Sequence, residues 1–434
     1  MASVEGTIAE AKTRIADALG GPARTQVILV LGGILGLDTA DKATVSAVSD
    51  QLKAAFHLSN TDIGLLLAAV SFVGAVATLP MGVLADRMRR RIVLLAAVGC
   101  WAVAMLASAA ATSFLFLLLT RLALGVVTAA AWPCIASLTG DFFPARERAS
   151  VFGLILSGEL VGAGIGFFVA GEVSTLLGWR WAFAAMALPP LVLAWTIWRY
   201  LPEPARGEQS WLRVGEEDAD AASRPDNGQS SGDNEADKSK VRRVMRQANV
   251  RPHPELVVHE DPTGWGWWRT MRYLLSLPTY GLLIAASTLA YFFFSGARAF
   301  AMIYFTEHYG LSRGLVSALV LVVGGGTIAG LVAGGRLSEW LLDKGRINAR
   351  INVPAAALFA SIPLLGIGIW TRSVWLGLLL LTLGSGTLAA ALAPLDAARL
   401  DIVHSRLWGR GEAGRMALRS LFEGGAPLLF GALS

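Results

Sequence analysis

The sequence predicts an all-α polytopic membrane protein, and three observations support this fold class. Of its 434 residues, 54% are hydrophobic and only 16% are charged, which is more apolar than a typical soluble domain. Eleven runs of roughly 20 mostly apolar residues recur along the chain, each long enough to cross about 30 Å of hydrocarbon. Glycine is frequent, at 47 residues, and small residues let helices pack closely in lipid.

The eleven runs fall into a set of six and a set of five, separated by a polar segment. Two six-helix halves that are parallel repeats would give this layout, so a twelfth span is expected. The chain ends at Ser434 together with the eleventh run, and we therefore expect the twelfth span to lie in a longer chain. The expected spans are 27–48, 63–84, 92–111, 114–138, 150–176, 181–199, 279–305, 315–342, 351–370, 374–395 and 416–433.

The polar segment separates the predicted domains, which are an N-terminal half at 1–200, a linker at 201–276 and an incomplete C-terminal half at 277–434. The linker is first acidic, then rich in serine and glycine, then basic, which is typical of a disordered tether. Its last part, 265–273, mixes tryptophan with arginine as a helix at the membrane interface does.

Lysine and arginine collect in alternate connections between the apolar runs. The connections after the second, fourth, eighth and tenth runs hold two to four of them, and the intervening ones hold at most one. The positive-inside rule places the cation-rich side in the cytoplasm. The N-terminus and the linker are therefore predicted to be cytoplasmic, in what we expect to be a bacterial inner membrane.

Several function classes find no support in the sequence. It contains no G-x-x-x-x-G-K-[ST] phosphate loop, no nucleophile elbow and no cofactor fingerprint, so neither an ATP-driven pump nor an enzyme is predicted. Cys100 and Cys134 lie singly within apolar runs, which indicates neither a metal site nor a disulfide. The net charge of +5 comes with arginines in short connections, which orient the chain in the bilayer rather than bind nucleic acid.

The connection after the second run carries a recognisable motif. It reads Gly82-Val-Leu-Ala-Asp86-Arg87-Met-Arg-Arg-Arg91, which resembles motif A of the major facilitator superfamily. An ordinary positive-inside connection would explain the arginines, but not Gly82 and Asp86 at that spacing. The connection after the eighth run is a looser copy, as an internal repeat predicts, with Gly335, Arg336, Glu339, Asp343, Lys344 and Arg346.

Two further matches to the same superfamily lie in and after the fourth run. Asp141, Pro144 and Arg148 fit its D-x-x-P-x-x-x-R pattern, and Arg121 and Gly125 fit its R-x-x-x-G motif B. The resemblance implies that Asp141 and Arg148 join the motif A residues in a lattice that closes the cytoplasmic side. It also implies that Arg121 lies near the path of the proton or the substrate.

Within this superfamily the chain most resembles the spinster branch of lipid and lysolipid transporters, over most of residues 31–433. Two departures from the branch are visible: the acid expected in the fourth run is Thr128, and the acid expected in the tenth falls near Gly386. The resemblance is carried by Asp41, Lys42, Thr44 and Val45, by Thr120-Arg121-x-x-x-Gly125, by Gly162-x-Gly-x-Gly166, and by the Trp-Arg-Tyr-Leu-Pro approach at 268–278.

Charged residues at membrane depth are the candidates for coupling and binding, because each needs a partner, water or a function. Asp38, Asp41 and Lys42 share one face of the first span, which allows a structural Asp38–Lys42 pair or a titrating Asp41. Glu159 lies on a glycine-rich face of the fifth span, as a hydrogen-bonded carboxylate between helices or as a substitute for the acid missing at Thr128. Arg298 is expected to gate against an aspartate, to clamp an anionic headgroup, or to snorkel outward.

These observations lead to a functional prediction. The chain is expected to be a monomeric, proton-coupled secondary transporter that moves an amphiphile by alternating access, without a cofactor. From the resemblance, the amphiphile is a lysophospholipid or a sphingoid lipid. Multidrug or organic-ion export is the alternative within transport, and a non-transporting receptor or scramblase is the alternative from another class.

Overall fold

The computed structural model describes residues 21–207, 258, 261–311, 313–346 and 348–433, and within these residues it contains helices and turns but no strand. The predicted all-α fold class is therefore confirmed. Most of the predicted linker, 208–257, lies outside the described residues.

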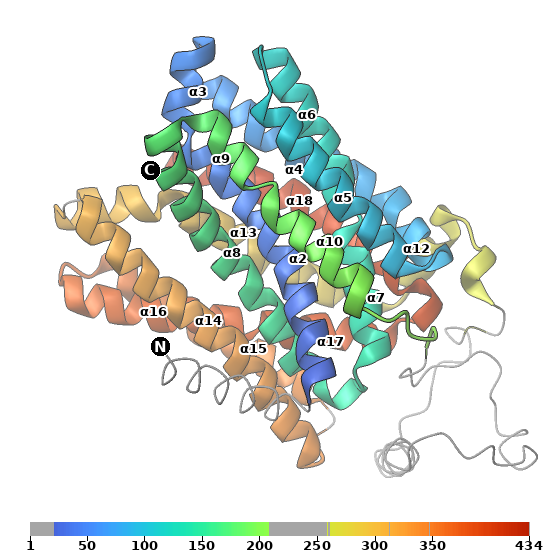
Figure 1. The fold of residues 1–434 in the computed structure, drawn as a ribbon. Coiled ribbons are helices and arrows are strands. Elements are labelled where there is room, and N and C mark those ends of the chain that lie inside the picture. The colour runs from blue at the N-terminus through green and yellow to red at the C-terminus, as the bar shows by residue number, and fades with distance from the viewer. Residues whose placement is uncertain (1–20, 208–257, 259–260, 312, 347, 434) are drawn as a thin grey trace, which may run out of the picture. The chain divides into compact units, whose positions relative to one another are not determined.

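Each of the first six predicted spans coincides with helix, and four of them are single continuous helices (Figure 1). The fourth span is broken at Ala129 and Ala130, and the sixth at Met186 and Ala187. Before the linker the helices are α2 (Pro22–Ala47), α3 (Ser49–Phe56), α4 (Asn60–Arg87), α5 (Arg90–Ala109), α6 (Phe114–Thr128), α7 (Ala131–Phe142), η1 (Ala145–Glu147), α8 (Arg148–Leu177), α9 (Trp179–Ala185) and α10 (Leu188–Tyr200).

The helices after the linker repeat part of this order. The pattern of helix, break, helix, 3₁₀ turn and helix over α6, α7, η1 and α8 recurs over α16, α17, η4 and α18, as an internal repeat requires. After the linker the helices are η3 (Pro262–Gly264), α12 (Trp267–Ser276), α13 (Pro278–Tyr309), α14 (Arg313–Asp343), α15 (Ala349–Trp370), α16 (Val374–Ala390), α17 (Leu392–Ile402), η4 (Ser405–Leu407) and α18 (Trp408–Leu433).

Nine segments among the described residues are long and apolar enough to cross a membrane. The predicted first and eleventh spans, α2 and α18, have 26 residues each and also have the length that a bilayer requires. Helix α2 carries Asp38, Asp41 and Lys42, which the sequence singles out, and α18 carries Arg419 and Glu423, which it does not. The chain is a multi-pass membrane protein.

Contacts group the helices into two compact units. Unit 1 comprises residues 1–135, 153–203 and 416–434, and unit 2 comprises residues 136–152 and 204–415. Three of the four boundaries fall within α7, α8 and α18, and each unit contains segments from both sides of the linker. The division into halves at the linker stays a prediction from the sequence.

Unit 1 is held together by aromatic packing near one end of its helices and by glycine contacts along them. Trp101, Trp179 and Phe183 are buried in its hydrophobic core. Gly125 of α6 packs on α4, because a Cβ there would lie 2.7 Å from the carbonyl oxygen of Val70. The glycine of the R-x-x-x-G motif therefore allows a close helix crossing.

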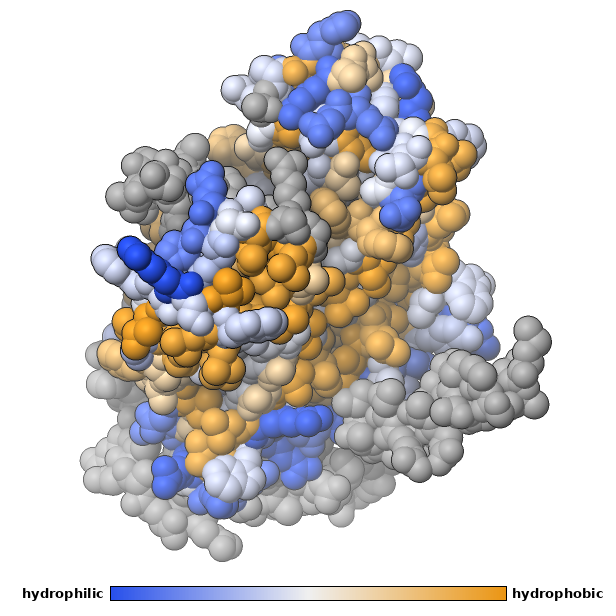
Figure 2. All heavy atoms as spheres, turned by 90° about the vertical axis from the view of Figure 1, so that its left-hand side faces the viewer, coloured by the Kyte–Doolittle hydropathy of each residue, from blue (hydrophilic) through white to orange (hydrophobic). Residues whose placement is uncertain are grey.

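Unit 2 has the same kind of close helix crossing at glycines, between α14 and α16. A Cβ added at Gly326, Gly330 or Gly334 would overlap atoms of α16. Spans two and four thus cross closely in unit 1, and spans eight and ten do so in unit 2. On the face drawn in Figure 2, hydrophobic side chains cover the helix surfaces and hydrophilic ones gather near helix ends, as lipid-facing helices require.

Candidate functional site

The site in unit 1 begins with a close crossing of α2 and α8. A Cβ added at Gly36, Gly158 or Gly162 would overlap backbone atoms of the opposite helix. The crossing lets the Thr39 hydroxyl of α2 donate to the carbonyl oxygen of Glu159 on α8, at 2.6 Å. It therefore brings the charged residues of the first span beside Glu159.

Asp41 turns away from this crossing toward Arg121 of α6. Its Oδ1 lies 2.7 Å from Nη1 of Arg121, and the two side chains are 4% and 0% exposed. Arg121 also donates to the Ser108 hydroxyl, and its guanidinium lies 5.1 Å from the ring centre of Phe183. Each charge of this buried pair is compensated by the other, and Arg121 has further partners. The two residues form a closed, charge-balanced site.

Lys42 pairs with Asp38 rather than with Asp41. Nζ of Lys42 lies 2.7 Å from Oδ2 of Asp38, one helical turn away, and the side chains are 40% and 26% exposed. The predicted local pair is thus present in the structure. It is more open than the pair between Asp41 and Arg121.

Glu159 has a cationic neighbour that the sequence analysis missed. Nη2 of Arg419, on α18, lies 3.8 Å from Oε2 of Glu159, and Nε of Arg419 lies 3.2 Å from Oε2 of Glu423. The charges of Arg419 and Glu423 also act on Lys42. Two charged residues four apart within the eleventh predicted span were the available signal. We call Asp38, Lys42, Glu159, Arg419 and Glu423 the Arg419 cluster.

The five described residues of the Arg419 cluster hold more acids than bases. It contains three carboxylates, two of them on α2 and α8 and one on α18, against one lysine and one arginine. Its formal charge is therefore −1, in contrast to the neutral pair of Asp41 and Arg121.

For two further predicted residues, Thr128 and Arg298, the described part of the chain gives no contact with these charges. The Thr128 hydroxyl donates to the carbonyl oxygen of Gly125 on its own helix, at 3.3 Å. The backbone of Arg298 lies in α13, but its side chain is outside the described residues. The roles predicted for both residues stay predictions.

The residues after α4 are held by a carboxylate that the sequence analysis did not name. Glu203 accepts from the backbone N–H of Arg91 at 2.7 Å, and Nε of Arg90 lies 3.0 Å from its Oε1. Asp86 is buried, at 2% exposure, whereas Arg87 is exposed. Gly82 is buried as well, in the last turns of the same helix.

In unit 2, Arg148 pairs with an acid that follows the tenth predicted span, in α17. Its Nη1 lies 3.1 Å from Oδ1 of Asp401, and its guanidinium lies 5.1 Å from the ring centre of Trp408. Asp141 accepts instead from the backbone N–H of Gly207, at 2.7 Å. Asp401 and Trp408 occupy the positions in the repeat that correspond to Asp141 and Arg148, which was the signal for Asp401.

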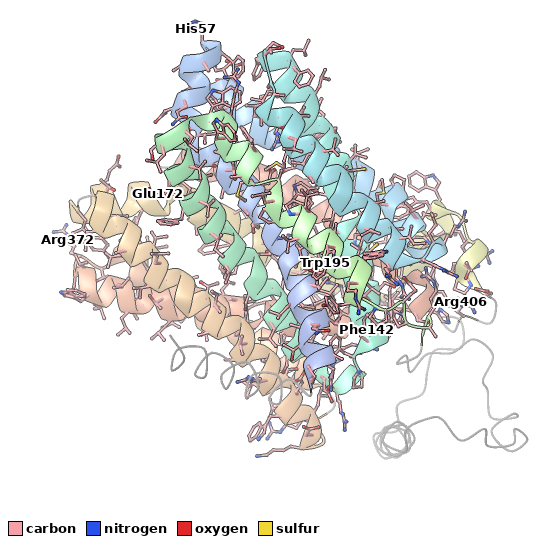
Figure 3. The ribbon with its side chains drawn as sticks, in the orientation of Figure 1. His57, Phe142, Glu172, Trp195, Arg372 and Arg406 are labelled. Atoms are coloured by element: carbon pink, nitrogen blue, oxygen red, sulfur yellow. The ribbon has the colours of Figure 1, made fainter. Side chains whose placement is uncertain are left out.

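A second arginine completes this group. Arg350, at the start of α15, pairs with Asp401 and donates to the carbonyl oxygen of Ala145. Glu339 accepts from the backbone N–H of Ser150 at 2.7 Å. Phe142 and Arg406 lie toward one end of unit 2 and Arg372 lies toward the other, as alternating connections require (Figure 3).

With this geometry established, a family model adds the decisive observation. The model described as Major Facilitator Superfamily matches residues 30–411, which is most of the chain. The chain belongs to the major facilitator superfamily. The relatives and structural neighbours of the chain are membrane transporters, and the resemblance to the superfamily is confirmed.

Two bacterial transporters are similar to part of the chain. A gallate transporter of Pseudomonas putida is 32% identical over 181 residues, which are 42% of this chain and 40% of that protein. A 4-hydroxybenzoate transporter of Pseudomonas aeruginosa is 30% identical over 185 residues, which are 43% of this chain and 41% of that protein. The matched region thus spans about two-fifths of either relative.

Solved structures of superfamily members match nearly the whole chain. The proton:xylose symporter XylE has a TM-score of 0.64 at 17% identity, covering 94% of this chain and 88% of that one. The human organic anion transporter MFSD10 has a TM-score of 0.63 at 18% identity, covering 94% and 93%. A bacterial homologue of spinster, inward-facing and occupied, has a TM-score of 0.53 at 20% identity, covering 94% and 81%. These likenesses show the major facilitator fold.

Proposed function

We propose that the chain is a monomeric, proton-coupled secondary transporter of an organic anion, working in a bacterial inner membrane. The observation that carries the proposal is the buried pair of Asp41 and Arg121, at 2.7 Å and at most 4% exposed. A carboxylate that is ionised against arginine in one state and protonated in another is a means of coupling a proton to a conformational change.

The pair suits a switch because both of its states have a physical rationale. Ionised, Asp41 compensates the charge of Arg121 inside the bundle. Protonated, it no longer holds the arginine, so α2 and α6 are released from each other at this point. Arg121 retains its contact with the Ser108 hydroxyl, which limits the cost of the released state.

An organic carboxylate is the cargo that the relatives favour. The gallate and 4-hydroxybenzoate transporters, at 32% and 30% identity, carry aromatic acids by name. MFSD10, a structural neighbour at 18% identity, is an organic anion transporter by its title. Cations at membrane depth, such as Arg419 and Lys42, are suitable partners for such an anion.

A lipid-like amphiphile is the second candidate cargo. The spinster resemblance of Asp41, Lys42, Thr44 and Val45 favours it, and so does the bacterial spinster homologue among the structural neighbours. A lysophospholipid or a sphingoid lipid would differ from an aromatic acid in requiring an apolar path for its chain.

Flux into proteoliposomes under an imposed pH gradient tests this proposal. We expect radiolabelled gallate or 4-hydroxybenzoate to accumulate with the gradient, and a fluorescent lysophospholipid to be moved more slowly. Asp41→Asn should abolish stimulation by the gradient. Asp50→Asn is the matched control, because Asp50 is 95% exposed beyond the end of the same span. Wild-type gradient dependence in Asp41→Asn would contradict the proposed coupling site.

A further inference from the structure

Arg419 lies halfway along α18, at the centre of a group of charges that the superfamily motifs do not explain. Its side chain is 8% exposed, and that of Glu159 is 17% exposed. Lys42 and Asp38 are more open, at 40% and 26%, and Glu423 is 29% exposed. Charged side chains at membrane depth face the bundle interior or water rather than lipid. The Arg419 cluster is therefore expected to face the bundle interior or water rather than lipid.

The contact of Arg419 with Glu159 is loose. The distance of 3.8 Å between Nη2 and Oε2 exceeds the roughly 2.7–2.9 Å of a charge-assisted hydrogen bond. On its own helix, Arg419 is held at 3.2 Å by Glu423, and the ring of Trp132 lies 5.7 Å from its guanidinium. These two neighbours fix the direction of the guanidinium fork. Its contact with α8 is the one that a competing carboxylate can replace.

The charges of the cluster allow such a replacement without a change in its net formal charge. With all acids ionised, the three carboxylates and two cations sum to −1. One proton on Glu159 brings the sum to zero, and one bound carboxylate returns it to −1. The empty cluster and the loaded, protonated cluster thus carry the same formal charge.

We propose that Arg419 binds the carboxylate of the cargo and that Glu159 is its internal competitor for the same guanidinium. The inference rests on the proposed function, in which a proton and an organic anion move together. A proton from the open side binds Glu159, which then loses its attraction to Arg419, and the cargo carboxylate takes its place beside Nη2. On the other side the cargo leaves, Glu159 releases the proton to water, and the contact with Arg419 returns.

The other cations of unit 1 are less suited to this exchange. Arg121 is 0% exposed and is held at 2.7 Å by Asp41, so a cargo carboxylate would first have to displace a closed pair. Lys42 is held at 2.7 Å by Asp38 on its own helix, and an ammonium lacks the bidentate fork. Arg419 combines an oriented guanidinium with a loosely held competitor.

Binding of benzoate to the purified full chain in lipid nanodiscs tests the inference without transport. Titration calorimetry at about pH 5.5 and about pH 8 compares benzoate binding at two proton concentrations. We expect wild-type affinity to be about tenfold higher at the lower pH. Glu159→Gln should bind with the higher affinity at both pH values, because its amide mimics the protonated acid. Arg419→Gln should lose about tenfold or more in affinity at both.

Two further variants keep the test interpretable. Glu172→Gln is the matched control for Glu159→Gln, because Glu172 is an exposed acid on the same helix, labelled in Figure 3. It should keep wild-type affinity and pH dependence. Arg419→Lys preserves the charge but not the fork, so it should fold even if Arg419→Gln does not, and should bind several-fold more weakly than wild type.

Three outcomes would overturn the inference: no benzoate binding by wild type, unchanged affinity in Arg419→Lys and Arg419→Gln, or wild-type pH dependence in Glu159→Gln. Failure of the proposed function is distinguishable from these. If the binding pattern is as expected but flux in proteoliposomes does not respond to the pH gradient, the carboxylate site on Arg419 is supported, whereas proton coupling through Asp41 or Glu159 is contradicted.

Discussion

Two charged sites on the same helix, α2, differ in closure and in charge balance. Asp41 is sealed against Arg121, with both side chains at most 4% exposed and the pair neutral. One residue further on, Lys42 belongs to the Arg419 cluster, whose members reach 40% exposure and whose formal charge is −1. Adjacent positions on a helix point about 100° apart, so one span can supply a closed site and an open one.

The comparison shows how burial determines the free-energy cost of removing one member of an ion pair. Removing one member of a sealed pair leaves an uncompensated buried charge, which is costly. Removing one member of an open pair leaves a charge that water can reach, and the cost is small. The open cluster is therefore the one that can exchange partners during a transport cycle, whereas the sealed pair must be broken by a proton.

The largest effect is expected from breaking the sealed pair. Arg121→Gln leaves Asp41 buried without its cation and should lower the free energy of unfolding by about 3–5 kcal/mol. Thermal unfolding in detergent, followed by circular dichroism, measures the loss. The double variant Asp41→Asn with Arg121→Gln should recover most of it, because no charge is then left alone. A double variant as unstable as Arg121→Gln would mean that packing rather than charge holds this site.

The next effect concerns the helix crossing that carries both sites. At Gly162 a Cβ would overlap Gly36, so Gly162→Ala should separate α2 from α8 and lower stability by about 1–3 kcal/mol. Gly164→Ala is the matched control, because a Cβ there meets no atom within 4 Å. It should instead stabilise α8 by up to about 1 kcal/mol. Equal effects at the two positions in a thermal unfolding assay would refute the close crossing.

Much of this arrangement can be predicted from the sequence. The contacts that cannot be predicted share a physical cause. The runs of apolar residues fixed the helices, and the spacing of four residues predicted the contact of Asp38 with Lys42, because both depend on local geometry. The partners Arg419 for Glu159 and Asp401 for Arg148 are 260 and 253 residues away in the chain. Such contacts depend on helix packing, for which local patterns carry little information.

The third effect concerns an ion pair of intermediate burial. Arg148 is 0% exposed and its partner Asp401 is 28% exposed, in the group predicted to close the cytoplasmic side. Asp401→Asn should weaken this group and shift the population toward inward-open forms, by roughly tenfold for a loss of about 1.4 kcal/mol. Spin labels in the connections after α7 and α17 measure the shift as longer distances. Asp343→Asn, an exposed acid of α14, should leave the distances unchanged.

The smallest effect is expected at the most open pair, Asp261 with Arg406, whose side chains are 52% and 44% exposed. The hydroxyl and backbone N–H of Thr263, followed by Arg406, lower the pKa of Asp261 from 3.8 to about 2. Its stabilisation is therefore present above the unfolded pKa of 3.8 and is lost as pH falls through about 2. Because the group is exposed, its contribution should be below about 1 kcal/mol.

Hydrogen exchange of the amides between 262 and 276, corrected for the intrinsic effect of pH, detects this small contribution. In wild type, protection should fall between about pH 5 and about pH 2.5, because protonation removes the acceptor of Thr263 and the partner of Arg406. Asp261→Asn should begin with the lower protection at about pH 5 and change little on acidification. If the variant instead keeps the acid-dependent loss, the effect belongs to another group, and the open pair contributes nothing to holding the segment before α12.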